Sequence, residues 1–172
     1  MAIAGRAVAR APLSPPTLPA ISSSPDDTAA RLEAAAHLAG GHARGIVYPG
    51  TEAEVAAVCA LGVPLLAIGA QSSVTGGATP MGELLVSTAR LTSIQWAGND
   101  CVRAGAGVTL TDLEAFLRAR GRTYPPAPTW TAATVGGIVS TNAAGPATFK
   151  HGVTRDWVTA LTVVLPGGDV LD

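Results

Sequence analysis

The chain has 172 residues, a length that suits one domain with a buried core. Hydrophobic residues make up 48 % of it, charged residues 13 %, and the formal net charge is −1. This balance excludes the strongly basic character that favours nucleic acids or anionic membranes, so we expect neither as a partner. We also expect no membrane span, because no apolar run reaches the roughly 18 residues that a spanning helix needs.

The first 25 residues differ in kind from the rest. They contain two arginines, five prolines and no acidic residue. A targeting peptide shares the arginine-rich, acid-poor composition, but the prolines disfavour an amphipathic helix and no continuous apolar core for a secretory signal is present. We therefore predict a disordered lead-in over residues 1–25, with a targeting segment as the alternative.

Helices and strands alternate between residues 26 and 90. Proline and two acids open a helix at Pro25, and Thr51 with Glu54 forms a capping box in which the Glu54 carboxylate reaches back to the Thr51 amide. This alternation favours a small parallel sheet. The predicted helices span residues 25–39 and 52–61, and the predicted strands span 45–50, 63–69 and 84–87.

After Arg90 the spacing becomes that of hairpins. A strand over 93–96 and the turn 97–100 precede a second apolar run, and Thr111 with Glu114 predicts a capped helix that ends at Gly121. The last 16 residues read as a strand, a Gly-Gly turn and a returning strand. Because the chain ends inside this hairpin, we expect its last strand to lack a neighbour and to promote self-association.

Two long stretches, residues 67–80 and 125–145, contain no charged residue. The first leaves the end of a predicted parallel strand, where open α/β sheets hold ligands and backbone amides form concave anion sites. A GxxxxGK[ST] phosphate loop, a complete GxGxxG fingerprint and a GxSxG elbow are all absent from the sequence. A tight helix-packing turn would explain Gly136 and Gly137 alone, whereas two such loops together suggest one long ligand with a diphosphate in its middle.

Five stretches in order resemble the FAD-linked oxidases of the vanillyl-alcohol oxidase/p-cresol methylhydroxylase (PCMH) superfamily, near the D-lactate dehydrogenase, glycolate oxidase subunit and alkyldihydroxyacetone-phosphate synthase group. The resemblance covers residues 44–172. It implies an α+β, PCMH-type FAD-binding fold with a small parallel subdomain over residues 26–90 and an incomplete antiparallel one over 91–172. The stretches are VYPGTEAEVAAV, AIGAQSSVTGGATP, VRAGAGVTLTDLEAFL, TVGGIVSTNAAG and KHGVTRDWVTALTVVLPGGDVLD.

The resemblance also implies which residues contact FAD. The first loop would wrap the diphosphate, and the second would follow the ribityl chain and the flavin ring. Ala70 and Gln71 stand where the family usually has glycine, so the position of Ala70 requires a negative φ. The implied cofactor-binding residues are Gly69, Ala70, Gln71, Ser72, Ser73, Gly76, Gly77, Pro128, Thr134, Gly136, Gly137, Thr141, Asn142 and Ala143.

Some relatives attach FAD covalently through a histidine in the first loop, where this chain has Gln71 and Ser72, so we expect non-covalent FAD. His151 lies beside the second loop and is more simply explained by packing or solvent contact. Arg155 and Asp156 are interpreted as a structural ion pair or cap. We predict no metal site, and the catalytic residues are unknown. Two buried, unpaired thiols, Cys59 and Cys101, indicate a reducing cytoplasm.

The sequence therefore predicts the FAD-binding portion of a flavin-dependent oxidoreductase that acts on a 2-hydroxy acid or a similar small substrate. A cap domain or partner subunit outside these residues would supply the substrate pocket. The alternatives are a truncated, non-catalytic product, one subunit of a split flavoenzyme, and a nucleotide-binding module unrelated to flavin.

Overall fold

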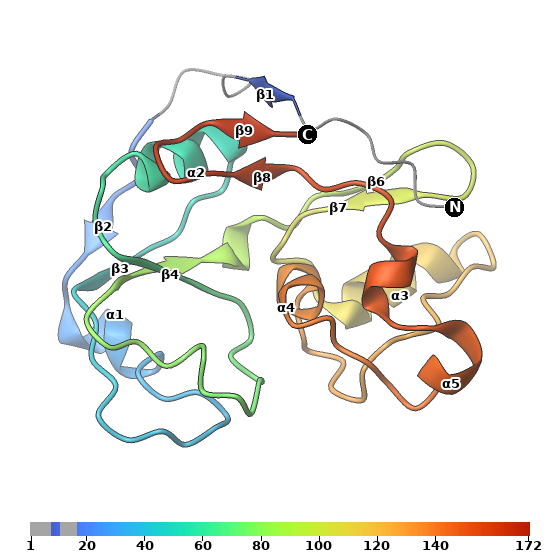
Figure 1. The fold of residues 1–172 in the computed structure, drawn as a ribbon, viewed down its shortest axis with the longest axis horizontal. Coiled ribbons are helices and arrows are strands. Elements are labelled where there is room, and N and C mark those ends of the chain that lie inside the picture. Colours follow the sequence, from blue (N-terminus) through green and yellow to red (C-terminus); the bar gives the residue numbers. More distant parts are fainter. Residues whose placement is uncertain (1–7, 11–16) are drawn as a thin grey trace.

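The computed structural model describes residues 8–10 and 17–172. Figure 1 shows two groups of elements side by side, with β3, β4 and α2 on the left and α3, α4 and α5 on the right. The left-hand group contains a four-stranded sheet in the order β2-β3-β5-β4. Its strands are β2 (Ile21–Ser22), β3 (Gly45–Val47), β4 (Leu65–Ile68) and β5 (Leu84–Ser87).

The sheet confirms the prediction of a parallel arrangement in this part of the chain. Strand β5 pairs in parallel with both β3 and β4, while β2 is antiparallel to β3 at the edge. All four residues of β5 are buried, as expected for an uncharged strand with a neighbour on each side. The loop that follows β4 therefore leaves the carboxyl end of a parallel strand.

Helix α2 (Glu52–Cys59) connects β3 to β4, and its cap matches the prediction in part. The Thr51 hydroxyl accepts a hydrogen bond from the Glu54 amide at 3.1 Å, as expected. The Glu54 carboxylate accepts from the amide of Gly50 at 2.6 Å, one residue before the amide that we predicted. The reciprocal contact is thus present with a shift of one residue, and it still satisfies a backbone donor at the helix entrance.

The predicted helix over residues 25–39 is wrong beyond its first turn, because α1 spans only Pro25–Ala29. The chain then bends against the first loop. The Gln71 side-chain amide donates to the carbonyl of Arg31, and the amide of Ala35 donates to the carbonyl of Gln71, both at 2.9 Å. His37 has a φ of 51°. Tertiary hydrogen bonds thus replace helical ones in a sequence of high helix propensity.

The right-hand group is built on a hairpin and a buried helix face. Strands β6 and β7 pair antiparallel, as predicted. The elements are β6 (Ile94–Trp96), β7 (Val102–Ala104), α3 (Leu110–Arg118), α4 (Val135–Ser140) and α5 (Thr148–His151), with 3₁₀ turns η1 (Thr88–Arg90) and η2 (Thr154–Trp157).

The expected cap of α3 at Thr111 is wrong. The helix begins after Thr109, whose hydroxyl accepts from the Asp112 amide at 3.1 Å and donates to the Asp112 carboxylate at 2.6 Å. Glu114 instead accepts a hydrogen bond from the amide of Tyr124 at 2.7 Å. The sequence contains two overlapping Thr-x-x-acid patterns, Thr109 with Asp112 and Thr111 with Glu114. The helix is capped by the first of them, which makes the buried Leu110 its first residue.

The C-terminal hairpin β8 (Val163–Val164) and β9 (Val170–Leu171) forms as predicted, but its expected unpaired edge is wrong. Strand β9 pairs with β8 on one side and with β1 (Ala9–Arg10) on the other. Arg10 donates to both carboxylate oxygens of Glu52 at 2.8 and 2.9 Å and to Asp172 at 2.5 Å. The hydrogen bond from Arg10 lowers the pKa of Asp172.

Strands β1 and β2 both lie in the predicted disordered lead-in, so that expectation is wrong for residues 9–10 and 21–22. Residues 1–7 and 11–16 of the same segment lie outside the described residues. Among the described residues, no helix has the length and apolarity needed to cross a membrane.

The described chain has three clusters of buried hydrophobic residues, and each draws its buried members from one side of Arg90. Two clusters draw their buried members from the β3, α2, β4 and β5 region, and the third draws its own from residues 108–138. The C-terminal hairpin is an exception, because it returns to α2, where the Gly167 amide donates to the Cys59 carbonyl at 3.2 Å. Figure 1 shows β8 and β9 beside α2 in the left-hand group.

Candidate cofactor site

The structure brings the two uncharged loops into contact. Gly69 follows β4 directly, and Thr134 is the N-cap residue of α4 in the other half of the molecule. A Cβ atom placed on Gly69 would lie 2.2 Å from the Thr134 hydroxyl oxygen, so only glycine allows this approach. Thr134 is buried. The backbone of the first loop therefore packs on the residue that starts α4.

The first loop contains a left-handed residue at an unexpected position. Gln71 has a φ of 50°, whereas Ala70 is not among the positive-φ residues, which meets the requirement that we placed on its methyl group. The Ser73 hydroxyl lies 3.0 Å from the Thr75 hydroxyl and accepts from the Thr75 amide at 3.3 Å. A Cβ on Gly77 would meet only the Thr75 hydroxyl oxygen, at 3.8 Å. The loop is thus braced internally at Ser73 and open at Gly77.

The two glycines of the second loop differ in their surroundings. A Cβ on Gly136 would lie 2.8 Å from the Ala106 Cβ, and the Gly136 amide donates to the Ala106 carbonyl at 2.8 Å. The helix-packing interpretation therefore accounts for Gly136. A Cβ on Gly137 would lie 3.2 Å from the Thr134 hydroxyl oxygen, and its amide donates to that same oxygen at 3.4 Å.

The end of the second loop is hydrogen-bonded to its own fold. The Thr141 hydroxyl donates to the Gly137 carbonyl at 2.9 Å. Asn142 has a φ of 48°, and its side-chain oxygen accepts from the amide of Arg155 at 3.0 Å. The Ala143 carbonyl accepts from the Thr154 hydroxyl at 2.6 Å. These groups hold the loop against η2, which the sequence pattern did not indicate.

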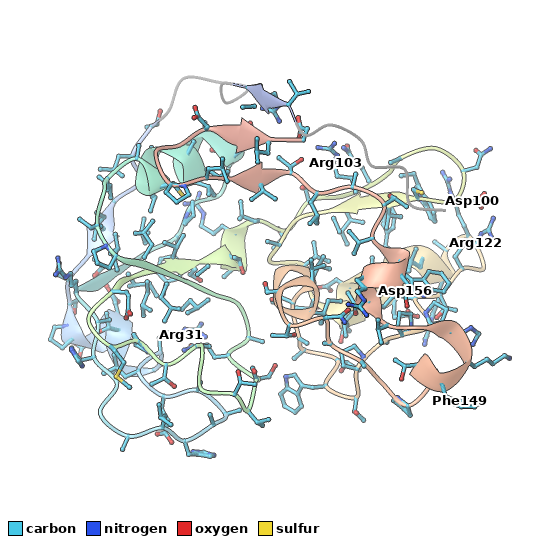
Figure 2. The ribbon with its side chains drawn as sticks, viewed as in Figure 1. Arg31, Asp100, Arg103, Arg122, Phe149 and Asp156 are labelled. Carbon is cyan, nitrogen blue, oxygen red and sulfur yellow. The ribbon has the colours of Figure 1, made fainter. Side chains whose placement is uncertain are left out.

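Thr154 is a buried residue that is hydrogen-bonded to the end of the second loop, and the sequence analysis did not identify it. It is 1 % exposed, donates to the Ala143 carbonyl and accepts from the Tyr124 hydroxyl at 2.7 Å. Burial raises the pKa of Tyr124, and the hydrogen bond to Thr154 opposes that shift. The neighbouring Asp156 caps η2 by accepting from the Val153 amide at 2.9 Å, which confirms the structural interpretation of that residue. Figure 2 shows Asp156, a residue of η2, in the right-hand half of the molecule.

We expect Thr154→Val to destabilise the protein by about 1–2 kcal/mol, because it leaves the half-buried Ala143 carbonyl and Tyr124 hydroxyl without their shared partner. Urea unfolding of both proteins measures the change. Thr154→Ser keeps the hydroxyl and is the control. An unchanged unfolding midpoint for the valine variant would contradict this role of the hydroxyl.

The two cysteines are both free and differ in their exposure. Cys59 is half-buried, and burial raises the pKa of its thiol. Cys101 is exposed, so its predicted burial is wrong; it lies in the turn between β6 and β7. In the part of the chain that the structure describes, no group of three His, Cys, Asp or Glu side chains could hold a metal ion.

A comparison with protein families identifies the domain. Residues 43–172 match the family described as FAD binding domain. The chain belongs to this family. This FAD binding domain has the PCMH-type fold that the resemblance implied, and FAD is confirmed as the cofactor that the family binds.

The relatives of this FAD binding domain are longer proteins. It is 40 % identical over 125 residues to a D-lactate dehydrogenase of Anaerostipes hadrus, covering 69 % of this chain and 26 % of the relative. It is 32 % identical over 113 residues to a glycolate oxidase subunit of Bacillus subtilis, covering 63 % of this chain and 24 % of the relative. The chain thus spans about a quarter of the length of these curated relatives.

Solved structures share the fold of this FAD binding domain. A chitooligosaccharide oxidase superposes with a TM-score of 0.78 at 24 % identity, over 90 % of this chain and 35 % of that one. A glucooligosaccharide oxidase of Acremonium strictum, described as having a novel flavinylation, gives 0.68 at 28 % identity, over 76 % and 29 %.

Proposed function

We propose that this chain is the FAD-binding part of an oxidoreductase that oxidises a 2-hydroxy acid and holds FAD without a covalent bond. The contact between Gly69 and Thr134 carries the proposal, because it joins two uncharged loops from the two halves of the molecule at one point. An extended dinucleotide needs such a surface, along which bare backbone lies against its diphosphate.

The residues of both loops fit FAD. Gly77 leaves space beside the first loop for an approaching ligand, and no charged side chain of either loop would oppose the diphosphate. The redox chemistry of such an enzyme belongs to the flavin, which accepts the two electrons taken from a substrate C–H bond. The residues of this chain bind and orient the cofactor. The proposed contacts remain Gly69, Ala70, Gln71, Ser72, Ser73, Gly76, Gly77, Pro128, Thr134, Gly136, Gly137, Thr141, Asn142 and Ala143, divided between subdomains 26–90 and 91–172.

The substrate class is supported by the names of the relatives. Lactate and glycolate, named in two of them, are both 2-hydroxy acids. We propose that a cap domain or partner subunit supplies the pocket and the catalytic base for this substrate. We also propose a cytoplasmic location, since Cys59 and Cys101 are both unpaired and free thiols are typical of reducing compartments.

Neither loop contains histidine or cysteine. These are the two side chains through which FAD is bonded in the glucooligosaccharide oxidase of Acremonium strictum. We therefore expect the purified protein to bind added FAD with a visible flavin spectrum and to release intact flavin into the supernatant after acid precipitation. Absorbance of supernatant and pellet measures the release. Flavin that stays with the precipitated polypeptide would contradict non-covalent binding, and absence of any flavin binding would contradict the proposed function.

A further inference from the structure

Gln71 occupies a backbone conformation that its residue type disfavours. It is one of three non-glycine residues of the described chain with positive φ, together with His37 and Asn142. A Cβ atom makes the left-handed region unfavourable, so a glutamine stays there only when surrounding contacts hold it. Glycine would adopt this conformation without strain. The glutamine side chain must therefore make contacts that compensate for the unfavourable backbone conformation.

That property is its side-chain amide. The Nε2 atom donates to the carbonyls of Arg31 and Ala78, each at 2.9 Å, and thereby uses both of its protons. The backbone carbonyl of Gln71 accepts a third hydrogen bond, from the backbone amide of Ala35 at 2.9 Å. Ala78 lies seven residues further along the same loop, and Arg31 and Ala35 belong to the segment after α1. Figure 2 shows Arg31 within the left-hand half of the molecule.

These three hydrogen bonds join both ends of the first loop to a neighbouring segment. The hydrogen bond to Ala78 joins the start of the loop to its end. The hydrogen bonds to Arg31 and Ala35 join the loop to residues 30–39, which follow α1 and are not helical. We infer that Gln71 is a positioning residue, a clasp that holds the first loop in its cofactor-accepting shape before FAD arrives. The inference rests on the proposed contact between this loop and FAD.

The clasp matters for binding because a loop that is already ordered loses little conformational entropy when the ligand arrives. Both side-chain donors of Gln71 are engaged within the protein, so they are not available to the cofactor. Its role differs from that of the loop glycines, which leave space. Gln71→Gly distinguishes a role in making hydrogen bonds from a role in leaving space. Glycine adopts the positive φ without strain and leaves space, but it cannot make the two side-chain hydrogen bonds.

The test compares Gln71→Gly and Gln71→Glu with the unmodified protein. Glutamate keeps the size of the side chain but cannot donate. We expect hydrogen exchange over residues 30–39 and 69–80 of the FAD-free protein to rise, and FAD affinity to fall, each by about tenfold, the change that a lost hydrogen bond of about 1.4 kcal/mol produces. Gln95→Glu is the matched control, because it makes the same change on an exposed glutamine of β6, outside both segments, and should leave their exchange and the FAD affinity unchanged.

Unchanged exchange and affinity in both Gln71 variants would overturn the inference. Faster exchange with unchanged FAD affinity would also overturn it, because the clasp would then serve the fold alone. Failure of the proposed function is distinguishable, since the unmodified protein would then bind no FAD in the same titration while the exchange measurement still reports on the clasp.

Discussion

Gly77→Val is expected to weaken FAD binding strongly while leaving the fold of the protein intact. At this position a Cβ would meet only one atom within 4 Å, the Thr75 hydroxyl oxygen at 3.8 Å, and the backbone is not in the left-handed region. The free protein therefore has room for a Cβ atom at this position. A cofactor lying against the loop does not, and overpacking of about 2 kcal/mol or more predicts a roughly thirtyfold loss of affinity at least.

The measurement is an FAD titration followed by flavin fluorescence, with a thermal unfolding curve recorded for the FAD-free protein. Ala97→Val is the matched control, because Ala97 is exposed in the turn between β6 and β7. Figure 2 shows Asp100 of the same turn at the far edge of the right-hand half. Gly76→Val is less informative, because a φ of 79° makes any side chain there strained whether or not FAD is near. Equal affinity of Gly77→Val and the unmodified protein would show that this loop face does not meet the cofactor.

The fold was predictable where its signal is local. Apolar runs and glycine stops located β3, β4 and β5, and the Thr51 cap placed the start of α2 correctly. Strand β1 could not be predicted, because two residues carry no strand signal and their partner β9 lies at the other end of the chain. Helix 25–39 failed for a related reason, since distant hydrogen bonds from Gln71 outweigh local propensity.

The sequence was enough to locate the two loops of the candidate site, but not to tell which of their side chains are hydrogen-bonded within the protein itself. Composition located both stretches, because uncharged runs rich in glycine and hydroxyls are unusual in a small domain. It could not tell that Asn142 bonds to the Arg155 amide, since short polar side chains often satisfy nearby backbone instead of a ligand. Thr154 gave no signal at all, because its importance depends on Tyr124 and Ala143, which only the folded chain brings together.

The contact between the loops yields a prediction about energetic coupling. Gly69→Ala places a methyl group against the buried Thr134 hydroxyl, so we expect a destabilisation of about 1–3 kcal/mol from overpacking. Thr134→Ala removes the N-cap of α4 and should cost about 1 kcal/mol. In the double variant the oxygen that the new methyl would strike is gone, and the nearest remaining side-chain atom is the Thr134 Cβ at 3.4 Å, an ordinary contact.

The double variant should therefore be about as stable as Thr134→Ala alone, so the coupling energy between the two sites should equal the cost of Gly69→Ala, about 1–3 kcal/mol. Urea unfolding of the four proteins gives this value directly. Thr51→Ala, which removes the comparable N-cap of α2, is the control partner, and its effect should add to that of Gly69→Ala because Thr51 is not among the atoms that a Gly69 side chain would meet. Both Gly69→Ala and the double variant should bind FAD more weakly than Thr134→Ala, since the added methyl lies where the first loop meets α4. Additive destabilisation by Gly69→Ala and Thr134→Ala would mean that the two loops do not touch in solution, and the joined cofactor surface would have to be abandoned.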